Sequence, residues 1–532
     1  MDALIGIIAF LFVLGLIVVI HEFGHFIFAR RVNILCREFA FGMGPLVYKK
    51  KKGETLYSIR ALPIGGFCAI AGEEVENNPL ANLQTIRVDM ENDVIKKIYV
   101  DPKNTVFNDK KEYKLISYEL FDEKNTGDLF MVLESNGEEI KYAVDPQAMF
   151  VLAKTEYQIA PYNRTIGSKR KRDRALVIFG GPLMNFLLAI VVFFIAGLIT
   201  GFPDPNTKTL GVVTEDTPSY HAGLRENDQI ISLKNGDLFV EIEKWSDVSN
   251  FMSKYTNGNY NGKISVTYLR DGKQFETLVN PQIAIYSAGI FSDFKKDGVF
   301  ILSASGKASV AGLVEGDEII RVNGVMVSSW KEVYTTFANN LNGDEVNLEI
   351  LRKGDIKEIT VKPYSKNVMD SQKSLSGDIV PIAKLAIGVS QEYKFSLPKS
   401  VSYSFSQTFS SAGLVFKTFK LLLSKNNNEV GVDDLSSFLG IYQLSKSVAI
   451  NIGFVGLLNL IGLLSVNVGL LNLLPIPALD GGRLVFIGYE AITKKKPNPK
   501  VETILITVTM FILFAFMIFA FYNDILRMIG VK

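Results

Sequence analysis

Long apolar stretches alternate with charged segments along this chain of 532 residues. A helix that crosses a bilayer needs roughly 17 to 25 consecutive, mostly apolar residues. Four stretches meet this requirement, so the pattern predicts four membrane-spanning helices. They cover residues 3–29, 175–202, 448–474 and 501–522.

The first predicted span differs from a cleaved signal peptide. The Met1-Asp2 start lacks a positively charged region, no cleavage site of small residues follows, and the apolar run continues past His25. We therefore expect this helix to be retained.

Lysine and arginine gather in the short segments beside the predicted spans. They lie in residues 30–52 after the first span, in 169–174 before the second, and in 494–500 between the third and fourth. With four spans these segments share one side, which the positive-inside rule makes cytoplasmic. Both termini and residues 201–448 would then lie outside.

The outer stretch contains an internal repeat. "AGLRENDQIISLKNG" (residues 222–236) returns as "AGLVEGDEIIRVNG" (residues 311–324), and Trp245 then matches Trp330. Each copy has the pattern of a short helix, an alternating strand, an Asn-Gly turn, a second helix and a hairpin. The copies resemble tandem PDZ domains of the bacterial kind. Such domains bind extended peptides by strand addition; the alternative is that these two act only as steric filters.

Composition narrows the classes of function. The chain is 48% hydrophobic with a mean hydropathy of +0.20, as expected of a membrane protein. Its net charge of +2 argues against a nucleic-acid partner. Cys36 and Cys68 are too few for a disulfide scaffold or a thiolate zinc cluster, so we expect free thiols.

The first span ends in a polar cluster, "HEFGH" (residues 21–25). On a helix, His21 and His25 share one face, where both can reach a single metal ion, and Glu22 lies beside them. A metal there activates water and polarises a carbonyl, while the carboxylate moves the proton. The transfer of an ionisable side chain into a membrane has an unfavourable free energy, so such residues usually have a function. We expect Gly24 to allow close approach of a neighbouring backbone.

Two histidines do not complete a catalytic zinc site, which usually has three protein ligands. The remaining histidine, His221, falls in the first repeat and is expected at the surface. Asp480, after a span interrupted by Pro475 and Pro477, is the better candidate. Its alternative role is that of a turn residue or a helix N-cap just past the membrane. The following Gly481 and Gly482 would let backbone crowd the metal.

These motifs together resemble the bacterial site-2 protease family, peptidase family M50. The resemblance is to intramembrane zinc metalloproteases of the regulator of sigma-E type with tandem PDZ domains. It rests on "HEFGH", on "LLPIPALDGG" after the third span, on residues 41–73, which are similar to the family's re-entrant β-hairpin, and on "GGPLMNFLLA" (residues 180–189). "NVGLLNLLPIP" (residues 467–477) also matches.

The resemblance implies a role for each motif residue. His21, His25 and Asp480 would ligate Zn²⁺, and Glu22 would be the catalytic base of a zinc metalloendopeptidase. Asn185 and Asn472 would position substrate or the intermediate; interhelical hydrogen bonding is the alternative. Arg483 stands where the family usually has histidine, so we assign it no catalytic role.

The resemblance also implies the substrate and the location. Members of the family cut transmembrane segments of membrane proteins, such as single-span anti-sigma factors or leftover signal peptides, in regulated intramembrane proteolysis. The expected location is the bacterial cytoplasmic membrane. The PDZ domains would be extracytoplasmic, and the active site would lie near the cytoplasmic side. The sequence leaves the oligomeric state open.

A transmembrane substrate must be unwound before its amide bonds can be attacked, because helical hydrogen bonds hide them. Residues 55–70 read as two strand segments around a break at residues 63–66, which predicts a hairpin whose edge clamps substrate. Gly65 and Gly66 in this break are expected to help position it. The alternative is a hairpin that only packs among lipid headgroups.

Two further segments carry no recognisable chemistry. Residues 74–168 form a charged insertion, either a small β-rich domain or a partner site. Residues 401–424 read as an amphipathic helix that guides substrate or packs on the surface.

The predicted fold class is a polytopic α-helical membrane protein with four transmembrane helices, a membrane-reentrant β-hairpin region and two α/β PDZ domains. The predicted divisions are a first span (1–30), a membrane-associated β region (31–73), a cytoplasmic insertion (74–168), a second span (169–202), two PDZ domains (203–290 and 291–366), a linker with an amphipathic helix (367–447), a third span with the Leu-Asp-Gly motif (448–484), and a cytoplasmic loop with the fourth span (485–532).

Two other classes compete with a protease. A catalytically inactive PDZ scaffold would have no chemical need for Glu22 together with a full ligand set. A zinc transporter would need polar residues along several spans, and the second and fourth spans have almost none.

Overall fold

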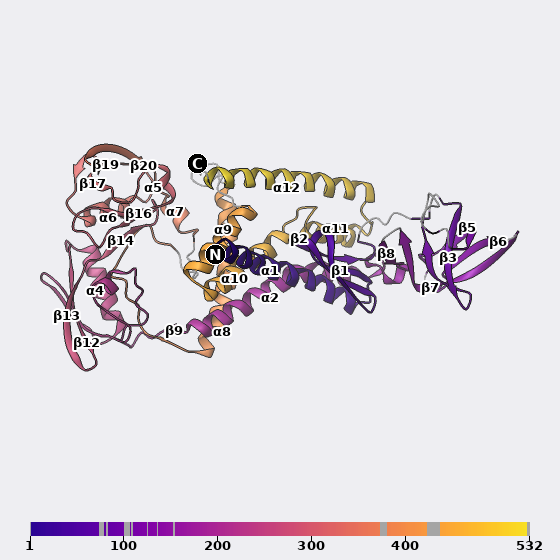
Figure 1. Cartoon of the computed structure of the whole chain (residues 1–532), viewed down its shortest axis with the longest axis horizontal. Helices are drawn as coiled ribbons and strands as arrows, with labels where there is room; N and C mark the ends of the chain where they lie inside the picture. The colour runs from indigo at the N-terminus through magenta and orange to yellow at the C-terminus, as the bar shows by residue number, and fades with distance from the viewer. Residues whose placement is uncertain are drawn as a thin grey trace. The chain divides into compact units, whose positions relative to one another are not determined.

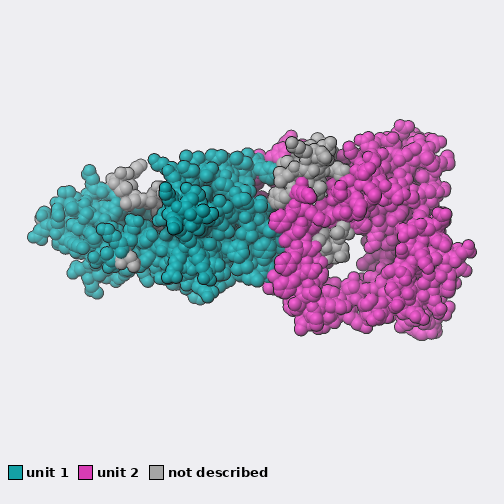
Figure 2. All heavy atoms as spheres, turned by 180° about the vertical axis from the view of Figure 1, so that it is seen from behind, with its two compact units in different colours: residues 1–189, 442–450, 461–516 teal, residues 190–441, 451–460, 517–532 magenta. Residues whose placement is uncertain are grey.

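The computed structural model of the chain describes residues 2–73, 79–80, 83–100, 107, 110–124, 126–135, 137–152, 155–372, 380–422 and 437–528. Parts of the predicted insertion and linker, and residues 423–424 of the predicted amphipathic helix, lie outside these ranges. The chain divides into two compact units, which are coloured separately in Figure 2. The first unit comprises Met1–Ala189, Tyr442–Ile450 and Ile461–Phe516; the rest forms the second.

Four helices among the described residues are long and apolar enough to cross a membrane, as the hydrophobic pattern predicted. They are α1 (Asp2–Arg31), α2 (Lys171–Thr200), α10 (Phe454–Asn472) and α12 (Pro499–Met528) (Figure 1). The third is shorter than predicted. Val448 belongs to a separate helix, α9 (Phe438–Asn451), and the break falls where Gly453 adopts a φ of +77°. A left-handed residue ends a helix, and glycine adopts that conformation without strain.

Strands β1 (Cys36–Lys52) and β2 (Thr55–Ile70) form an antiparallel sheet that turns between Lys52 and Thr55. Residues 38–41 of β1 pair along both edges, with 56–59 on one side and 66–69 on the other. The predicted hairpin, with its turn at residues 63–66, is therefore wrong, because the two halves of β2 flank β1. Among the described pairings, no strand joins the outer edge of residues 66–69.

The insertion is a small β-domain, one of its two predicted alternatives (Figure 1). Its sheet has the order β4-β3-β5-β6-β7-β8, and parallel pairing of β4 with β7 closes the sheet on itself. Fully buried side chains such as Ile95, Ile98, Met131 and Leu133 fill its interior. The strands are β3 (Thr85–Glu91), β4 (Val94–Tyr99), β5 (Glu112–Glu119), β6 (Phe130–Ser135), β7 (Glu138–Leu152) and β8 (Thr155–Gln158).

The second unit contains the two sequence repeats as matching structures. Their four-stranded sheets have the equivalent orders β11-β10-β12-β13 and β18-β17-β19-β20. A buried aspartate pairs with an arginine of the third strand in each copy, Asp228 with Arg270 and Asp317 with Arg352. The internal repeat is thus confirmed, while the PDZ assignment stays a prediction.

The elements of the first repeat are α3 (Pro218–His221), β10 (Gln229–Asn235), β11 (Leu238–Glu241), α4 (Trp245–Asn257), β12 (Ile264–Arg270) and β13 (Lys273–Val279). Those of the second are α5 (Gly306–Val310), β17 (Glu318–Val322), β18 (Val325–Met326), α6 (Trp330–Asn339), β19 (Val346–Arg352) and β20 (Asp355–Val361).

The predicted linker (367–447) contains regular structure in its described part. Strand β21 (Lys384–Ala386) joins the sheet β16-β15-β14-β21, so the chain returns to the repeats after residue 366. The amphipathic helix is present as α8 (Leu397–Leu422). The remaining elements are β9 (Phe202–Pro203), β14 (Gln282–Ile285), β15 (Ile290–Ser292), β16 (Ile301–Ala304), α7 (Lys366–Met369), β22 (Tyr393–Lys394) and α11 (Asp480–Thr493), with short 3₁₀ turns at Tyr162–Arg164 and Ile166–Ser168.

Candidate metal centre and active site

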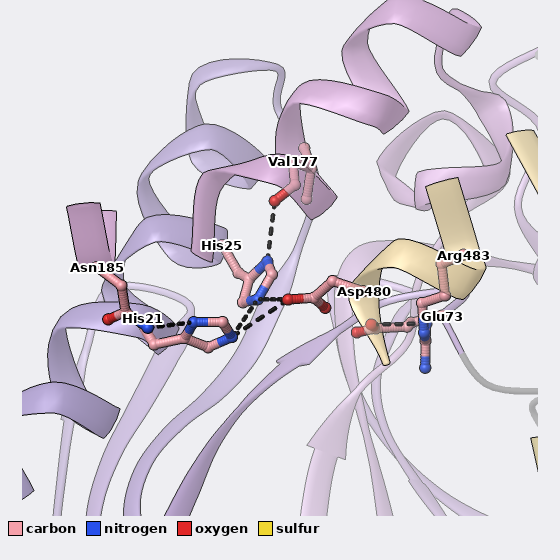
Figure 3. Close-up of polar contacts among 7 residues, drawn as sticks. All are labelled: His21, His25, Glu73, Val177, Asn185, Asp480 and Arg483. Atoms are coloured by element: carbon pink, nitrogen blue, oxygen red, sulfur yellow. Dashed lines mark hydrogen bonds and ion pairs between the residues drawn. The ribbon is translucent and has the colours of Figure 1, made fainter. Parts of the chain in front are cut away.

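Two histidines of α1 point at one another inside the first unit. Helix α1 is continuous through this region, so His21 and His25 lie one turn apart on the same face. Both side chains are buried, and their Nε2 atoms are 3.2 Å apart (Figure 3). The sequence prediction that the two rings share one face is confirmed.

Asp480 approaches the same point from a distant part of the chain. It is the first residue of α11, which begins after the segment interrupted by Pro475 and Pro477. Its Oδ2 atom lies 3.3 Å from His21 Nε2 and 3.5 Å from His25 Nε2. This oxygen forms no hydrogen bond of good geometry in the described part of the chain, although both ring nitrogens lie within ion-pair distance of it.

The spacing of the three donor atoms fits a zinc ion. Zinc bonds of about 2.0–2.2 Å in a tetrahedron separate neighbouring ligand atoms by roughly 3.3–3.6 Å. The measured separations are 3.2, 3.3 and 3.5 Å. Three electron-pair donors this close and this buried repel one another unless a proton or cation lies between them. The arrangement is therefore chemically suited to a metal, and three protein ligands are the number usual in catalytic zinc sites.

Helix α2 supplies a polar neighbour for the other nitrogen of each ring. His25 Nδ1 lies 2.9 Å from the carbonyl oxygen of Val177, and His21 Nδ1 lies 3.1 Å from the side-chain amide of Asn185 (Figure 3). Hydrogen bonds of this kind orient metal-binding imidazoles. The structure therefore brings Asn185, a predicted site residue, directly to the metal centre.

Glycines let α1 and α2 approach closely at this level. A Cβ on Gly24 would overlap the carbonyl of Gly180, which confirms the close backbone approach expected of Gly24. A Cβ on Gly181 would lie 2.7 Å from His25 Cε1 and 2.8 Å from His21 Cε1. Real Cβ contacts are essentially never that short, so the rings occupy the space that a side chain at residue 181 would need.

A cavity of about 760 Å³ opens onto the three donors and is also lined by Glu22. The Glu22 carboxylate follows His21 on α1 and has no hydrogen-bond or ion-pair partner among the described residues. Gly66 of β2 lies beside it, since a Cβ there would be 3.6 Å from Glu22 Cγ and 2.8 Å from the Ala40 carbonyl oxygen. Residues 67–70 of β2 continue along the cavity wall. The cavity thus joins a free carboxylate to an unpaired strand edge.

An ion pair absent from the sequence prediction lies at the same cavity. Arg483, in the first turn of α11, donates from Nη1 to Glu73 Oε1 at 2.7 Å (Figure 3). Burial raises the pKa of Glu73 above its ordinary value, and the Arg483 guanidinium opposes that rise. The pair connects the segment after β2 to the helix that carries Asp480. The sequence contains both charges but no signal that pairs residues so far apart.

The remaining predicted residues have less direct positions. Gly65 has a φ of +79° and lies against Met43 rather than Glu22. Asn472 ends α10, is half-buried, and is not among the described residues that line the cavity. His221 is exposed, as expected. Cys36 and Cys68 are free thiols, as predicted, and both are buried.

The structure gives Gly481 and Gly482 a packing role that the sequence did not predict. A Cβ on Gly481 would overlap the carbonyls of Leu473 and Leu474, and one on Gly482 would overlap that of Ile476. The two glycines therefore let α11 fold back on the turn that precedes it.

The sequence matches a family model and several curated proteins. The model is that of peptidase family M50, which covers residues 9–516. The chain is 30% identical to zinc metalloprotease RasP of Oceanobacillus iheyensis over 98% of this chain and 99% of that protein. It is 29% identical to the regulator of sigma-W protease RasP of Bacillus subtilis over 98% of each chain.

Proposed function

Since the chain belongs to peptidase family M50, we propose that it is an intramembrane protease with zinc held by His21, His25 and Asp480. The chain is a zinc metalloprotease and a membrane protein, as its family and relatives establish. The proposed site rests on the close approach of three ligand atoms, His21 Nε2, His25 Nε2 and Asp480 Oδ2. They lie 3.2–3.5 Å from one another, in a cavity that Glu22 also lines. Both histidines stand on a helix apolar enough to span a membrane.

Zinc and the side chains of the cavity would have different roles in the reaction. Zinc, when bound, supplies Lewis acidity toward the scissile carbonyl and the attacking water. Glu22 takes a proton from that water and passes it to the leaving nitrogen. Because Glu22 is without a partner among the described residues, its oxygens are available for this transfer. Gly66 leaves room for the Glu22 side chain against β2.

The edge of β2 is suited to hold an unwound substrate. A transmembrane helix buries its amides in its own hydrogen bonds, so the segment to be cut must become extended. Residues 66–69 offer an edge that no described strand occupies, and residues 67–70 line the catalytic cavity. An extended segment can add to this edge by main-chain hydrogen bonds and pass Glu22.

We propose membrane proteins with a single span as substrates, either an anti-sigma factor or a remnant signal peptide. One relative is named a regulator of sigma-W protease, which supports the first kind. The basic segments beside the spans support a cytoplasmic membrane location with the active site near the cytoplasmic face and the two repeats outside. The repeats would then dock peptide as PDZ-like domains.

Reconstitution of the purified protein in lipid vesicles with a single-span model substrate tests the function. We expect cleavage by the wild type, loss of cleavage in Glu22→Gln with zinc retained, and loss after chelation that added zinc restores. Cleavage by Glu22→Gln at the wild-type rate would contradict the assigned base. Wild-type protein that holds zinc and cuts no transmembrane segment would contradict the proposed activity.

A further inference from the structure

The two histidines can bind a metal through Nε2 only in one tautomer. A ligating nitrogen must present its lone pair, so the proton of a neutral imidazole then resides on Nδ1. That Nδ1–H is a buried donor and needs an acceptor. The neighbour of each Nδ1 therefore decides whether its ring is ready for metal.

The acceptor for His25 is fixed by the backbone. A carbonyl oxygen can only accept a hydrogen bond, so the Val177 carbonyl 2.9 Å from His25 Nδ1 requires the proton there. The proton position of His25 is therefore set by a main-chain group of α2.

The neighbour of His21 is an amide that has two orientations. The atom placed 3.1 Å from His21 Nδ1 is Asn185 Nδ2, while Asn185 Oδ1 is buried without any partner in the described part of the chain. Rotation of the amide by 180° exchanges these two atoms at almost the same positions. The rotated amide accepts from Nδ1–H and leaves Nε2 free for metal, whereas the unrotated amide requires the proton on Nε2.

We infer that Asn185 is a positioning residue that accepts a hydrogen bond from His21 Nδ1 and so holds the metal-binding tautomer of that ring. This inference rests on the proposed zinc site. It differs from the role implied by the family resemblance, in which Asn185 contacts substrate or intermediate. Asn185 is fully buried against the ring and is not among the described residues lining the catalytic cavity.

The surroundings hold Asn185 firmly enough for this task. The Ser465 hydroxyl of α10 donates to the Asn185 main-chain carbonyl at 2.8 Å. Gly469, one turn further on α10, lies against the Asn185 side chain, where an added Cβ would be 3.3 Å from Asn185 Cβ. Helix α10 thus fixes the backbone from which the amide reaches His21.

Zinc affinity in a set of substitutions tests the inference. Purified variants are titrated with zinc against a chromophoric chelator, and the wild type in the same titration reports on the site itself. We expect Asn185→Leu to weaken zinc binding by about 10- to 100-fold, the usual effect of losing such a partner. Asn185→Asp keeps an acceptor in place, so its zinc affinity should stay at least equal to that of the wild type. Asn459→Leu removes another amide whose oxygen is buried without a partner among the described residues, and it should have no effect.

The outcomes separate the two roles of Asn185. Unchanged zinc affinity in Asn185→Leu would overturn the inference and leave substrate positioning. Equal weakening in Asn185→Leu and Asn185→Asp would also overturn it, because the amide nitrogen would then be the necessary group. A wild type that binds no zinc would instead refute the proposed metal site.

The tautomer can also be read without altering the site. The chain has three histidines, so His221→Gln leaves only His21 and His25. In ¹⁵N-histidine spectra of this zinc-loaded protein, we expect two rings with protonated Nδ1 and metal-bound Nε2. A His21 ring bound through Nδ1 would overturn the inference even if Asn185→Leu fails to fold.

Discussion

The backbone of Gly181 lies against the imidazole of His25, so that a Cβ on Gly181 would fall 2.7 Å from the ring carbon Cε1. Helix α2 therefore forms one wall of the metal centre through the absence of a side chain. The same glycine limits His21, whose Cε1 would be 2.8 Å from that Cβ. Both rings hold their positions because nothing projects from residue 181.

Substitution of this glycine should empty the metal site. We expect Gly181→Ala to displace the histidine rings and to lower bound zinc at least tenfold, as measured by elemental analysis of purified protein. Gly488→Ala is the matched control, because a Cβ at that position in α11 meets no atom of the described residues within 4 Å. Wild-type zinc content in Gly181→Ala would contradict the packing described.

Substitution of Gly66 should change the position of the base, Glu22, without changing metal binding. An added Cβ would be 2.8 Å from the Ala40 carbonyl oxygen and 3.0 Å from Val18 Cγ1, so β2 must shift relative to Glu22. We expect Gly66→Ala to lower kcat by about 10- to 100-fold, because small misplacements of reacting groups have effects of that size. Bound zinc should stay at the wild-type level.

Gly53→Asn is the control for Gly66→Ala. Gly53 lies at the β1–β2 turn with a φ of +65° and open space around it, and asparagine tolerates this conformation. Equal losses of kcat in the two variants would show that the sheet, and not the position of Glu22, is responsible.

The Glu73–Arg483 pair predicts a pH-dependent stability. Burial already raises the Glu73 pKa, and removal of the opposing guanidinium in Arg483→Ala should raise it further. A carboxyl whose folded pKa exceeds its unfolded value of about 4.3 destabilises the fold as pH rises from that value through the folded pKa. We expect Arg483→Ala to lose about 1–3 kcal/mol at neutral pH and less in acid.

Thermal unfolding in detergent across this pH range measures the effect. The free-energy difference between the double variant Arg483→Ala with Glu73→Gln and the single variant Glu73→Gln should not change with pH, because neither protein has a carboxylate at residue 73 to ionise. A pH dependence that persists in this difference would assign the effect to another group.

A second ion pair holds the other end of α11. Glu490 is buried, and Arg174 of α2 donates to its Oε2 at 2.6 Å. We expect Arg174→Ala to destabilise the protein by about 3 kcal/mol, because a buried carboxylate then lacks its partner. The unfolding midpoint should largely recover in Arg174→Ala with Glu490→Gln, and a double variant as unstable as the single one would refute this.

The sequence was sufficient for the features that depend on local pattern. Helical spacing placed His21 and His25 on one face, and the unfavourable position of Asp480 after an apolar span marked it as a partner. The internal repeat predicted two equivalent small domains, because the same residue types recur at the same spacing in both copies. Each of these signals is contained within a short segment.

The sequence was insufficient where the structure depends on long-range packing. Both halves of β2 bind to β1, and no local signal chooses between that arrangement and a hairpin at residues 63–66. Gly181 matters because it has no side chain where the histidine rings lie, and the sequence has no pattern that indicates such a role. The third span looked continuous because hydropathy does not register the left-handed Gly453 that divides it.

The central claim is that Asp480 completes a zinc site with His21 and His25 while Glu22 serves the reaction. The most direct measurement is the zinc content per chain of the purified isosteric variants Asp480→Asn and Glu22→Gln beside the wild type. We predict one zinc per chain in the wild type and in Glu22→Gln, and little or none in Asp480→Asn. Wild-type zinc content in Asp480→Asn would contradict the claim.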